Sequence, residues 1–392
     1  MTSGTTAAPS VRLDARQRAV LDRVAAAERA SIAALPTDDP LDPKRRARVA
    51  ATLPELVAQP QAVRATWAAG SEALERVASS LLERRPERVL LTGAGDSLAV
   101  LAAARLALEG ALGVPCEPVQ SLELAKYQVG TLSDRTLVVA LSSSGETTRT
   151  AEALLLAQHA GAATLALTNT PGSTLDVEST HQLHVVATRV GWPTQSSTAA
   201  LALLLRLACL VRVGARQAGA EALLAELDAL PEAMGEALAG IDAPLAAQAA
   251  REAAGRMYLF SGGGPSAAAA VVGAAKVKEC TPDHALAVQV EEYHHYNSQK
   301  AGEPLWLIAP SGPSVPRALD TAREARRFGG RVYVVTSAGE TAFDGEDVDG
   351  VVRLPDVAEE LSGLLTFLPA QLVGYHLAVA KFALAEAGGP RG

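Results

Sequence analysis

Runs of β-branched and aliphatic residues recur along the chain, each followed by a glycine- or serine-rich turn and then by an apolar helical pattern. Residues 88–108 read RVLLTGAGDSLAVLAAARLAL, and residues 137–160 read LVVALSSSGETTRTAEALLLAQHA. Two further strands are predicted at residues 163–168 and 184–187, and an apolar helix is predicted at residues 199–213. Continuous apolar strands that alternate with helices are typical of a parallel sheet with helices on both faces.

The segments around these units are predicted mostly as helix. Apolar and charged residues alternate at helical spacing over residues 13–35. A second helical pattern over residues 44–82 is divided at Pro60, which we expect to start a new helix. The other predicted elements are a short strand at residues 115–119, a polar loop at 121–126, a helical region at 216–254 and a disordered tail at 1–10.

The same order of elements recurs in the second half of the chain. RMYLFSGGGPSAAAA at 256–270 matches RVLLTGAGDSLAVLAA, LWLIAPSGPS at 305–314 matches VVALSSSGET, RVYVVTSAG at 331–339 matches ATLALTNTPG, and VVRLP at 351–355 matches LHVVA. Matched positions are about 168 residues apart, and four matches in one order predict a duplicated domain. We therefore predict an α/β protein with an N-terminal tail and helical extension (1–49), two tandem doubly wound domains (50–215 and 245–392) and a helical connector (216–244).

The composition argues against several classes of protein. The 392-residue chain has a net charge of −8 and a sequence pI of about 5.5, so no basic surface for nucleic acid is expected. No uninterrupted apolar run reaches the length of about 18 residues that a membrane span needs, and the first ten residues lack the features of a secretory signal. Three scattered cysteines have neither disulfide nor metal-binding spacing. We expect a cytoplasmic protein without a cofactor or a metal.

The turn SSSGET at residues 142–147 carries the clearest chemical signal. A loop between a buried strand and a helix N-terminus presents backbone N–H groups and the positive end of the helix dipole, and serine and threonine add hydroxyls. Such a loop suits an anion or a polyhydroxylated molecule, most simply a phosphorylated sugar. The alternative is an ordinary helix cap, with Ser144 capping and Glu146 and Thr147 in the first turn. Ligands of parallel sheets bind at the carboxyl ends of strands, where both this turn and GAGDS (93–97) fall.

These features resemble the sugar isomerase (SIS) domain family, and the likeness covers residues 50–385. It is to the isomerase portion of glucosamine-6-phosphate synthase and to related amino-sugar-phosphate deaminases, deglycases and isomerases. SSSGET resembles the family's S-Q-S-G-E-T phosphate-binding motif, GAAKVKE at 273–279 its G-A-L-K-L-K-E helix, and EYHH at 292–295 its E-L-K-H loop.

The resemblance implies roles for individual residues. Glu279 would move a proton between C1 and C2 of the sugar, His295 would be the ring-opening acid/base, and Lys276 would support the anionic intermediate. The residues that would hold the phosphate are Ser97, Ser142, Ser143, Ser144 and Thr147. The other residues expected to bind substrate are Gly95, Asp96, Thr194 and Glu292.

The residue types suit this chemistry independently. A carboxylate can remove a proton next to a carbonyl, and histidine titrates near neutral pH as ring opening requires. Lys276 and Glu279 are three residues apart, hence on one face of a helix, where a surface salt bridge is the plainer explanation without the resemblance. Glu292 and His295 have the same spacing, which occasionally ligates a metal, but a single such pair makes a metal site unexpected.

The sequence departs from the synthase pattern in two informative ways. Asp96 stands where the synthase has a threonine beside the phosphate. A carboxylate there would repel a phosphate dianion unless a cation or a hydrogen-bonded hydroxyl intervenes, and it could instead hold sugar hydroxyls. The chain begins Met-Thr with no cysteine before Cys116, so glutamine hydrolysis by an N-terminal cysteine is not expected.

The sequence therefore predicts a sugar-phosphate or amino-sugar aldose–ketose isomerase, with coupling to deamination or deglycation left open. Two alternatives remain: a non-catalytic sugar-phosphate sensor or partner subunit, and an isomerase of a non-phosphorylated sugar. In the resembling synthase the histidine equivalent to His295 enters the neighbouring subunit's site. We therefore expect a homodimer with shared active sites, whose partner is a small sugar or sugar phosphate and neither nucleic acid nor a membrane.

Overall fold

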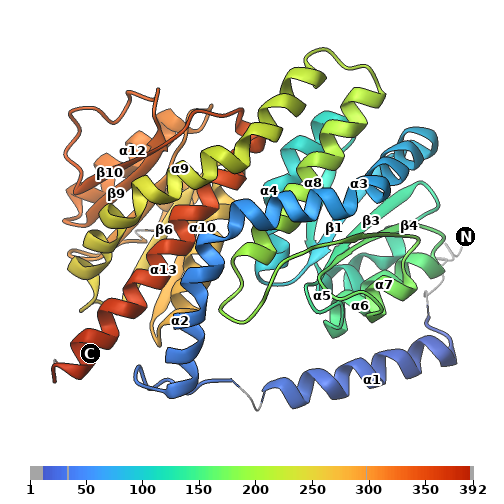
Figure 1. Cartoon of the computed structure of the whole chain (residues 1–392), viewed down its shortest axis with the longest axis horizontal. Coiled ribbons are helices and arrows are strands. Elements are labelled where there is room, and N and C mark those ends of the chain that lie inside the picture. The colour runs from blue at the N-terminus through green and yellow to red at the C-terminus, as the bar shows by residue number, and fades with distance from the viewer. Residues whose placement is uncertain (1–11, 33–34, 297, 389–392) are drawn as a thin grey trace, which may run out of the picture.

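Two separate parallel sheets of five strands form the two halves of the molecule (Figure 1), in a computed structural model that describes residues 12–32, 35–296 and 298–388. The first sheet has the order β2-β1-β3-β4-β5 and the second the order β10-β9-β8-β6-β7. Their strands are β1 (Arg88–Gly93), β2 (Cys116–Gln120), β3 (Thr136–Leu141), β4 (Ala163–Thr168), β5 (His181–His184), β6 (Met257–Gly262), β7 (His284–Gln289), β8 (Pro304–Ile308), β9 (Arg331–Ser337) and β10 (Gly350–Leu354). Written from its other edge, the second order is β7-β6-β8-β9-β10, which repeats the order of the first sheet. The predicted pair of doubly wound sheets is therefore confirmed.

Long helices cover both sheets and meet between them. The main helices are α3 (Gln59–Arg84), α4 (Asp96–Leu112), α6 (Thr148–His159), α8 (Gln195–Gly214), α9 (Ala220–Glu252), α10 (Pro265–Cys280), α12 (Val315–Arg327) and α13 (Gly363–Glu386). Helix α4 packs on both α8 and α10, and α10 packs on α13, so one apolar core runs through both halves.

The central strand β3 shows why the apolar runs become buried strands. Leu137, Val139 and Leu141 point into the core between the two halves, whereas Val138 and Ala140 belong to clusters on the opposite face of the sheet. Successive side chains of a strand alternate between faces, so a sheet covered by helices on both sides needs an uninterrupted apolar sequence. The carboxyl end of β3 thereby delivers the serine-rich turn to the edge of the sheet.

The N-terminal region forms two helices that touch different parts of the body. Helix α1 (Ala15–Ile32) lies along the first half and packs against α6 (Figure 1). Its Arg16 also donates two hydrogen bonds to the Glu178 carboxylate, at 2.7 and 2.8 Å. Helix α2 (Pro43–Val57) packs on α13 of the second half. Helix α3 begins at Gln59 with Pro60 in its first turn, which confirms the predicted start.

Three predictions of local structure are wrong. Residues 121–126 are helical rather than a loop, in α5 (Ser121–Glu123) and a π-helix (Leu124–Gln128), because the Gln120 side chain caps the N–H groups of Leu122 and Glu123. The fourth strand lies at His181–His184, three residues before its predicted place. The EYHH segment belongs to the short helix α11 (Val290–Tyr296) rather than to a loop. The predicted tail at residues 1–10 lies outside the described residues.

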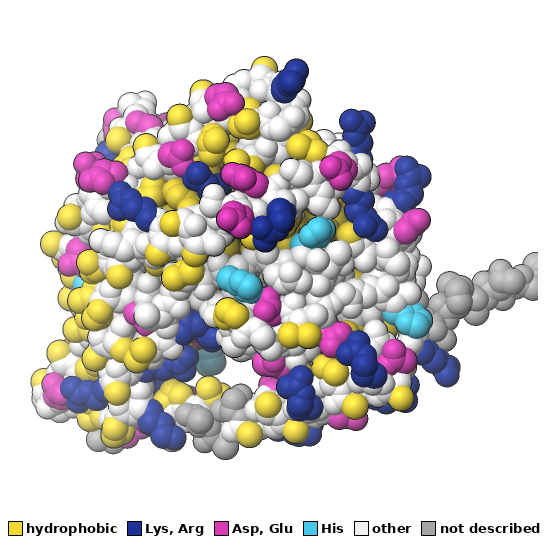
Figure 2. Space-filling view, turned by 45° about the vertical axis from the view of Figure 1, so that its right-hand side comes forward, with side chains coloured by type: hydrophobic (Ala, Val, Ile, Leu, Met, Phe, Trp, Pro, Cys, Tyr) yellow, Lys and Arg dark blue, Asp and Glu magenta, His cyan; other side chains and the backbone are white. Residues whose placement is uncertain are grey.

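Two helices, α8 and α13, are long and apolar enough to cross a membrane by length and composition alone, with mean hydropathy of 1.7 and 1.4. Neither helix is an uninterrupted apolar run, because Arg206 interrupts α8 and Gln371 and His376 interrupt α13. Their most apolar windows are 72% and 78% buried inside the fold, as in core helices of soluble proteins. On the face shown in Figure 2, basic and acidic side chains are interspersed.

Candidate functional site

Residues 142–147, the serine loop, connect the end of β3 to the start of α6. Ser142 Oγ is 2.9 Å from Thr147 Oγ1 and accepts a hydrogen bond from the Gly145 N–H at 3.1 Å. Ser144 Oγ accepts one from the Glu146 N–H at 3.2 Å. The N-cap residue of α6 is Thr147, not Ser144 as the alternative interpretation had it. The hydroxyls therefore gather directly before the first turn of the helix.

Gly145 gives the serine loop its conformation. Its φ is +67°, and a Cβ there would lie 1.9 Å from Ser173 Oγ, so a side chain is excluded both by backbone strain and by space. The next residue, Glu146, turns away from the hydroxyls, and its carboxylate accepts hydrogen bonds from the N–H and hydroxyl of Thr174 at 2.7 and 2.8 Å. The loop is thus closed by contacts on its outer side while its serines remain on the inner side.

A pocket of about 190 Å³ lies on that inner side, which we call the serine pocket. The first turns of α4, α6 and α8 all border it, and the unpaired N–H groups of a helix N-terminus favour anions. Its polar lining residues are Asp96, Ser97, Ser142, Ser143, Ser144, Thr147, Arg189, Ser196, Ser197 and Glu279. Three helix N-termini with a ring of hydroxyls form a site suited to a phosphate group.

Lys276 joins the two halves of the molecule at this pocket. Its side chain is 1% exposed, and Nζ donates to Asp96 Oδ2 at 2.6 Å and to Glu279 Oε2. Asp96 starts α4 of the first half, whereas Lys276 and Glu279 lie on α10 of the second. The cation required by the Asp96 carboxylate is therefore supplied by Lys276, a pairing across 180 residues.

In the triad of Asp96, Lys276 and Glu279, the last two residues have shifted pKa values. Burial lowers the pKa of Lys276, but the charges of Asp96 and Glu279 outweigh it, so the pKa of Lys276 is raised overall. Burial raises the pKa of Glu279; Lys276 opposes this shift, and the charge of Asp96 adds to it. The Glu279 side chain is 29% exposed and borders the pocket. A carboxylate with a raised pKa in contact with a ligand pocket is suited to act as a general base.

Two contacts fix the end of α10 that carries Lys276 and Glu279. Arg45 of α2 donates from Nη1 to the backbone carbonyl of Glu279 at 2.9 Å, where a cation also suits the negative end of the helix dipole. Gly374 of α13 lies against Lys276, because a Cβ there would be 2.6 Å from Lys276 Cβ. Both contacts hold the backbone that positions Lys276 and Glu279.

The remaining predicted residues lie around the pocket or away from it. Thr194 is the N-cap residue of α8, next to the pocket-lining Pro193, and its buried hydroxyl has no partner among the described residues. Gly95 has φ +57° and precedes Asp96, but it borders a different cavity. His295 and Glu292 lie on α11 outside the serine pocket. The His295 side chain is 58% exposed, and its Nε2 is 3.3 Å from Glu291 Oε1.

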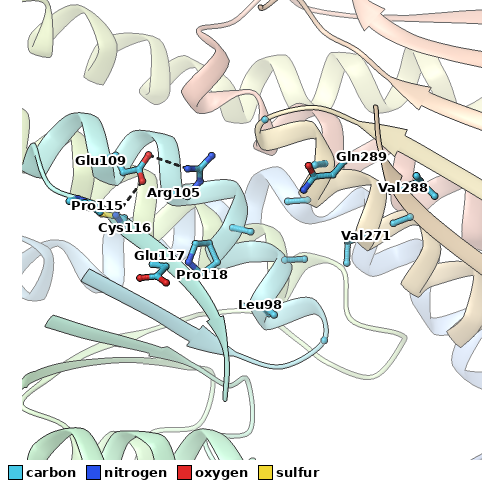
Figure 3. Close-up of a pocket in the computed structure, with 17 residues that line it drawn as sticks. Leu98, Arg105, Glu109, Pro115, Cys116, Glu117, Pro118, Val271, Val288 and Gln289 are labelled. Atoms are coloured by element: carbon cyan, nitrogen blue, oxygen red, sulfur yellow. Dashed lines mark hydrogen bonds and ion pairs between the residues drawn. The ribbon is translucent and has the colours of Figure 1, made fainter. Parts of the chain in front are cut away.

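A larger cavity of about 590 Å³ lies between α4 and β2 of the first half and α10 and β7 of the second (Figure 3). Leu98, Val271 and Val288 contribute apolar walls. Its charged pair, Arg105 and Glu109, is joined at 3.5 Å, and Glu109 also accepts from the Cys116 N–H at 3.2 Å. With its charges already paired, this cavity lacks the converging polar groups of the serine pocket.

The second half has no equivalent of the serine loop. Residues 310–314 read PSGPS in place of SSGET, and the carboxylate of Glu359 lies over this turn. Glu359 Oε1 is 3.2 Å and 2.9 Å from the positions that a Cβ on Gly264 and on Gly312 would take. An anionic side chain of the chain itself thus lies where an anion would enter the second sheet.

Sequence reasoning missed three pocket residues: Arg189, Ser196 and Ser197. The available signal was the segment after the fourth strand, TRVGWPTQSST, which leads from a strand into an apolar helix as the serine loop does. Within the part of the chain that the structure describes, no group of three or more His, Cys, Asp or Glu residues is arranged to hold a metal ion.

Comparison with known proteins gives a consistent picture. The SIS domain model matches residues 82–209. A glutamine–fructose-6-phosphate aminotransferase (isomerizing) of Methanothermobacter thermautotrophicus is 31% identical over 331 residues, which are 84% of this chain and 54% of that protein. One of Pseudomonas syringae is 33% identical over 301 residues, 75% of this chain and 49% of that protein. The chain thus spans about half the length of these curated relatives.

Solved structures agree in fold. The C-terminal domain of the glucosamine-fructose-6-phosphate aminotransferase from Francisella tularensis matches with a TM-score of 0.76 at 21% identity, over 84% of this chain and 96% of that one. The glucosamine-6-phosphate deaminase from Thermotoga maritima matches with a TM-score of 0.64 at 20% identity, over 84% and 94%. The chain therefore contains a SIS domain at residues 82–209, is similar in sequence to about half of the length of glutamine–fructose-6-phosphate aminotransferases, and shares the fold of the Francisella tularensis domain.

Proposed function

We propose that the chain is a sugar-phosphate aldose–ketose isomerase that moves a proton between C1 and C2 of a phosphorylated sugar. The observation that carries this proposal is the Asp96–Lys276–Glu279 triad beside a hydroxyl-lined pocket where three helices begin. The relatives' names add that chemistry on hexose 6-phosphates occurs on this fold. The substrate's identity, and coupling to deamination or deglycation, remain open within this class.

Each group has a role in the proposed reaction. The hydroxyls of Ser142, Ser144 and Thr147 and the first turn of α6 hold the phosphate. Glu279 removes the proton from C2 of the aldose and returns one to C1, or the reverse, through an enediolate. Lys276, fully charged because of its two carboxylates, stabilises the negative oxygen of this intermediate. Asp96 keeps Lys276 in place, and Lys276 in turn neutralises the Asp96 carboxylate, which would otherwise repel the incoming phosphate.

We also propose that the enzyme is a homodimer and that His295 acts in the active site of the partner subunit. His295 lies outside the serine pocket of its own chain and remains largely exposed, free to enter a neighbouring site. Val271 of α10 and Leu286 of the edge strand β7 are 44% and 49% exposed, which favours coverage by a second copy. In this arrangement His295 opens the sugar ring.

Proton exchange tests the proposed reaction. Fructose 6-phosphate, glucose 6-phosphate and glucosamine 6-phosphate are incubated in D2O with the wild-type protein, and NMR follows deuterium at C1 of the ketose and at C2 of the two aldoses, together with the release of ammonia. We expect wild-type exchange on one of these sugars, none with Glu279→Gln, and unchanged exchange with Glu236→Gln, an exposed residue of α9. Exchange by Glu279→Gln at the wild-type rate would remove Glu279 from the mechanism. Binding of the sugars without exchange would favour the sensor alternative.

A further inference from the structure

Arg189 is a cation at the serine pocket that forms no ion pair with a carboxylate of the described chain. It borders the pocket, and its guanidinium has neither an ion pair nor a hydrogen bond within the described residues. Burial and then the charge of Arg48 lower the pKa of Arg189, against the opposing charge of Glu55. Arginine remains charged in proteins, so this exposed side chain brings a positive charge to the lining of the pocket.

The loop that carries Arg189 is held on both sides of it by one buried carboxylate. Glu55 of α2 is 6% exposed. Its Oε1 accepts from the Thr188 hydroxyl at 2.9 Å and from the Val190 N–H at 2.7 Å, and its Oε2 accepts from the Gly191 N–H at 3.2 Å. Arg189 lies between two residues bound to the same carboxylate, so the direction of its backbone is set before any ligand arrives.

Three further contacts join α2 to this loop. Thr52 Oγ1 accepts from the Trp192 N–H at 2.9 Å, and the Arg48 guanidinium stacks 3.8 Å from the centre of the Trp192 ring. Gly191 packs so closely on α2 that a Cβ there would lie 2.6 Å from Thr52 Cα. Helix α2 therefore acts as a rigid support for residues 188–192.

The triad gives the pocket an excess of negative charge, so phosphate binding there needs a further cation such as Arg189. Lys276 is shared by Asp96 and Glu279, so these three residues carry one excess negative charge when both carboxylates are ionised. A phosphate dianion entering the pocket would be repelled by that excess. Arg189 lines the pocket and forms no ion pair with a carboxylate among the described residues. Its planar guanidinium can donate two hydrogen bonds to one phosphate.

Ser196 provides an independent indication of a ligand at the same place. Its side chain is 1% exposed and borders the pocket, yet its hydroxyl lacks a hydrogen-bond partner in the described structure. A buried polar group without a partner carries a free-energy cost that a bound ligand removes. Ser196 lies in the first turn of α8, directly after the loop that carries Arg189.

We propose that Arg189 is the residue that makes the pocket select a phosphorylated sugar, by pairing with the phosphate beside the Ser196 hydroxyl, and that Glu55 positions it. The inference rests on the proposed function, because it assigns the anion-binding residue of the same pocket. Arg189 touches the ligand, whereas Glu55 acts only through the loop.

Calorimetric titration of the full chain tests the role of Arg189. Wild type, Arg189→Ala, Arg189→Lys and the control Arg327→Ala, an exposed arginine at the end of α12, are titrated with fructose 6-phosphate, fructose and inorganic phosphate. Loss of a charge-assisted contact predicts that Arg189→Ala binds fructose 6-phosphate and phosphate about tenfold more weakly or worse, with fructose unchanged. Arg189→Lys should retain part of the affinity, and Arg327→Ala all of it.

The outcomes separate this inference from the proposed function. If the wild type prefers fructose 6-phosphate to fructose and Arg189→Ala keeps that affinity within about twofold, the inference is wrong and the function stands. If the wild type binds fructose as tightly as its 6-phosphate, both are wrong.

A double-mutant cycle tests the positioning role of Glu55. We expect Glu55→Ala to weaken fructose 6-phosphate binding in the wild-type background and to have no further effect in Arg189→Ala, because Glu55 acts through that residue. Glu55→Gln, which keeps an acceptor, should restore part of the affinity. Equal effects of Glu55→Ala in both backgrounds would show a general structural role and would overturn the positioning claim.

Discussion

Replacement of Lys276 by methionine tests whether the buried triad has the charges that the structure implies. Methionine matches the length of most of the lysine stem, so the change removes a charge while leaving little empty space. Lys276 Nζ is the partner of both Asp96 Oδ2, at 2.6 Å, and Glu279 Oε2. The variant leaves two carboxylates facing each other without the ammonium between them.

The expected cost follows from burial. Breaking a fully buried pair costs about 3–5 kcal/mol, because it leaves an uncompensated charge. Asp96 is 14% exposed and Glu279 29% exposed, so water screens part of the loss. We therefore expect Lys276→Met to lower the free energy of unfolding by about 2–4 kcal/mol near pH 8.

The effect should depend on pH in a defined direction. Glu279 already has a raised pKa in the folded protein, and loss of Lys276, which opposes this shift, raises it further. A group whose folded-state pKa is raised binds more protons when folded, so its stabilising contribution is present at low pH and is lost as pH rises through the folded pKa. The stability difference between variant and wild type should therefore shrink between pH 8 and pH 5.

Urea unfolding followed by circular dichroism at both pH values measures this difference. Lys278→Met is the matched control, because Lys278 lies two residues further along α10 and is exposed. It should leave stability within about 0.5 kcal/mol of wild type at either pH. The reasoning would be refuted by a Lys276→Met protein as stable as wild type at pH 8, or by a loss that does not change with pH.

Two further predictions concern the serine loop and the assembly. Gly145→Ala should reduce the affinity for fructose 6-phosphate in calorimetry by at least about tenfold, because the new Cβ collides with Ser173. The control is Gly172→Ala, since Gly172 has φ +78° but open space around it. This control should lose only the backbone strain energy of about 1–2 kcal/mol in stability and keep the affinity. Mixing inactive Glu279→Gln and His295→Ala proteins under conditions of subunit exchange should restore up to about a quarter of wild-type activity. Half of the dimers are then mixed, and each mixed dimer has one intact site. No recovery after proven exchange would mean that each chain completes its own site.

The fold was predictable because its signals are local. An apolar run, a glycine or serine turn and a helix recur in both halves, and each such unit can be recognised within about thirty residues. The strand β5 was misplaced because His181–His184 carries only one fully buried residue, Leu183, whereas the apolar Val185 and Val186 that follow it lie outside the register of the strand. Weak apolar character at a sheet edge leaves the register of a strand open.

The site was predictable only in part. Lys276 and Glu279 could be placed on one helix face from their spacing, and the serine loop from its position after a strand. The contact of Lys276 with Asp96 joins two halves of the chain across a helix interface, and no local pattern encodes it. Arg189 escaped detection for the same reason, because its support comes from Glu55 of α2, more than a hundred residues earlier. Tertiary contacts of this kind need the structure.

A crystal structure of the Glu279→Gln variant with a bound hexose 6-phosphate tests the central claim most directly. The account predicts the phosphate in the serine pocket, with its oxygens within hydrogen-bond distance of Ser142, Ser144 and Thr147, at about 2.5–3.0 Å, and with C1 and C2 beside residue 279. A sugar phosphate bound instead in the cavity between α4 and α10, or with its phosphate away from the serine loop, would contradict it.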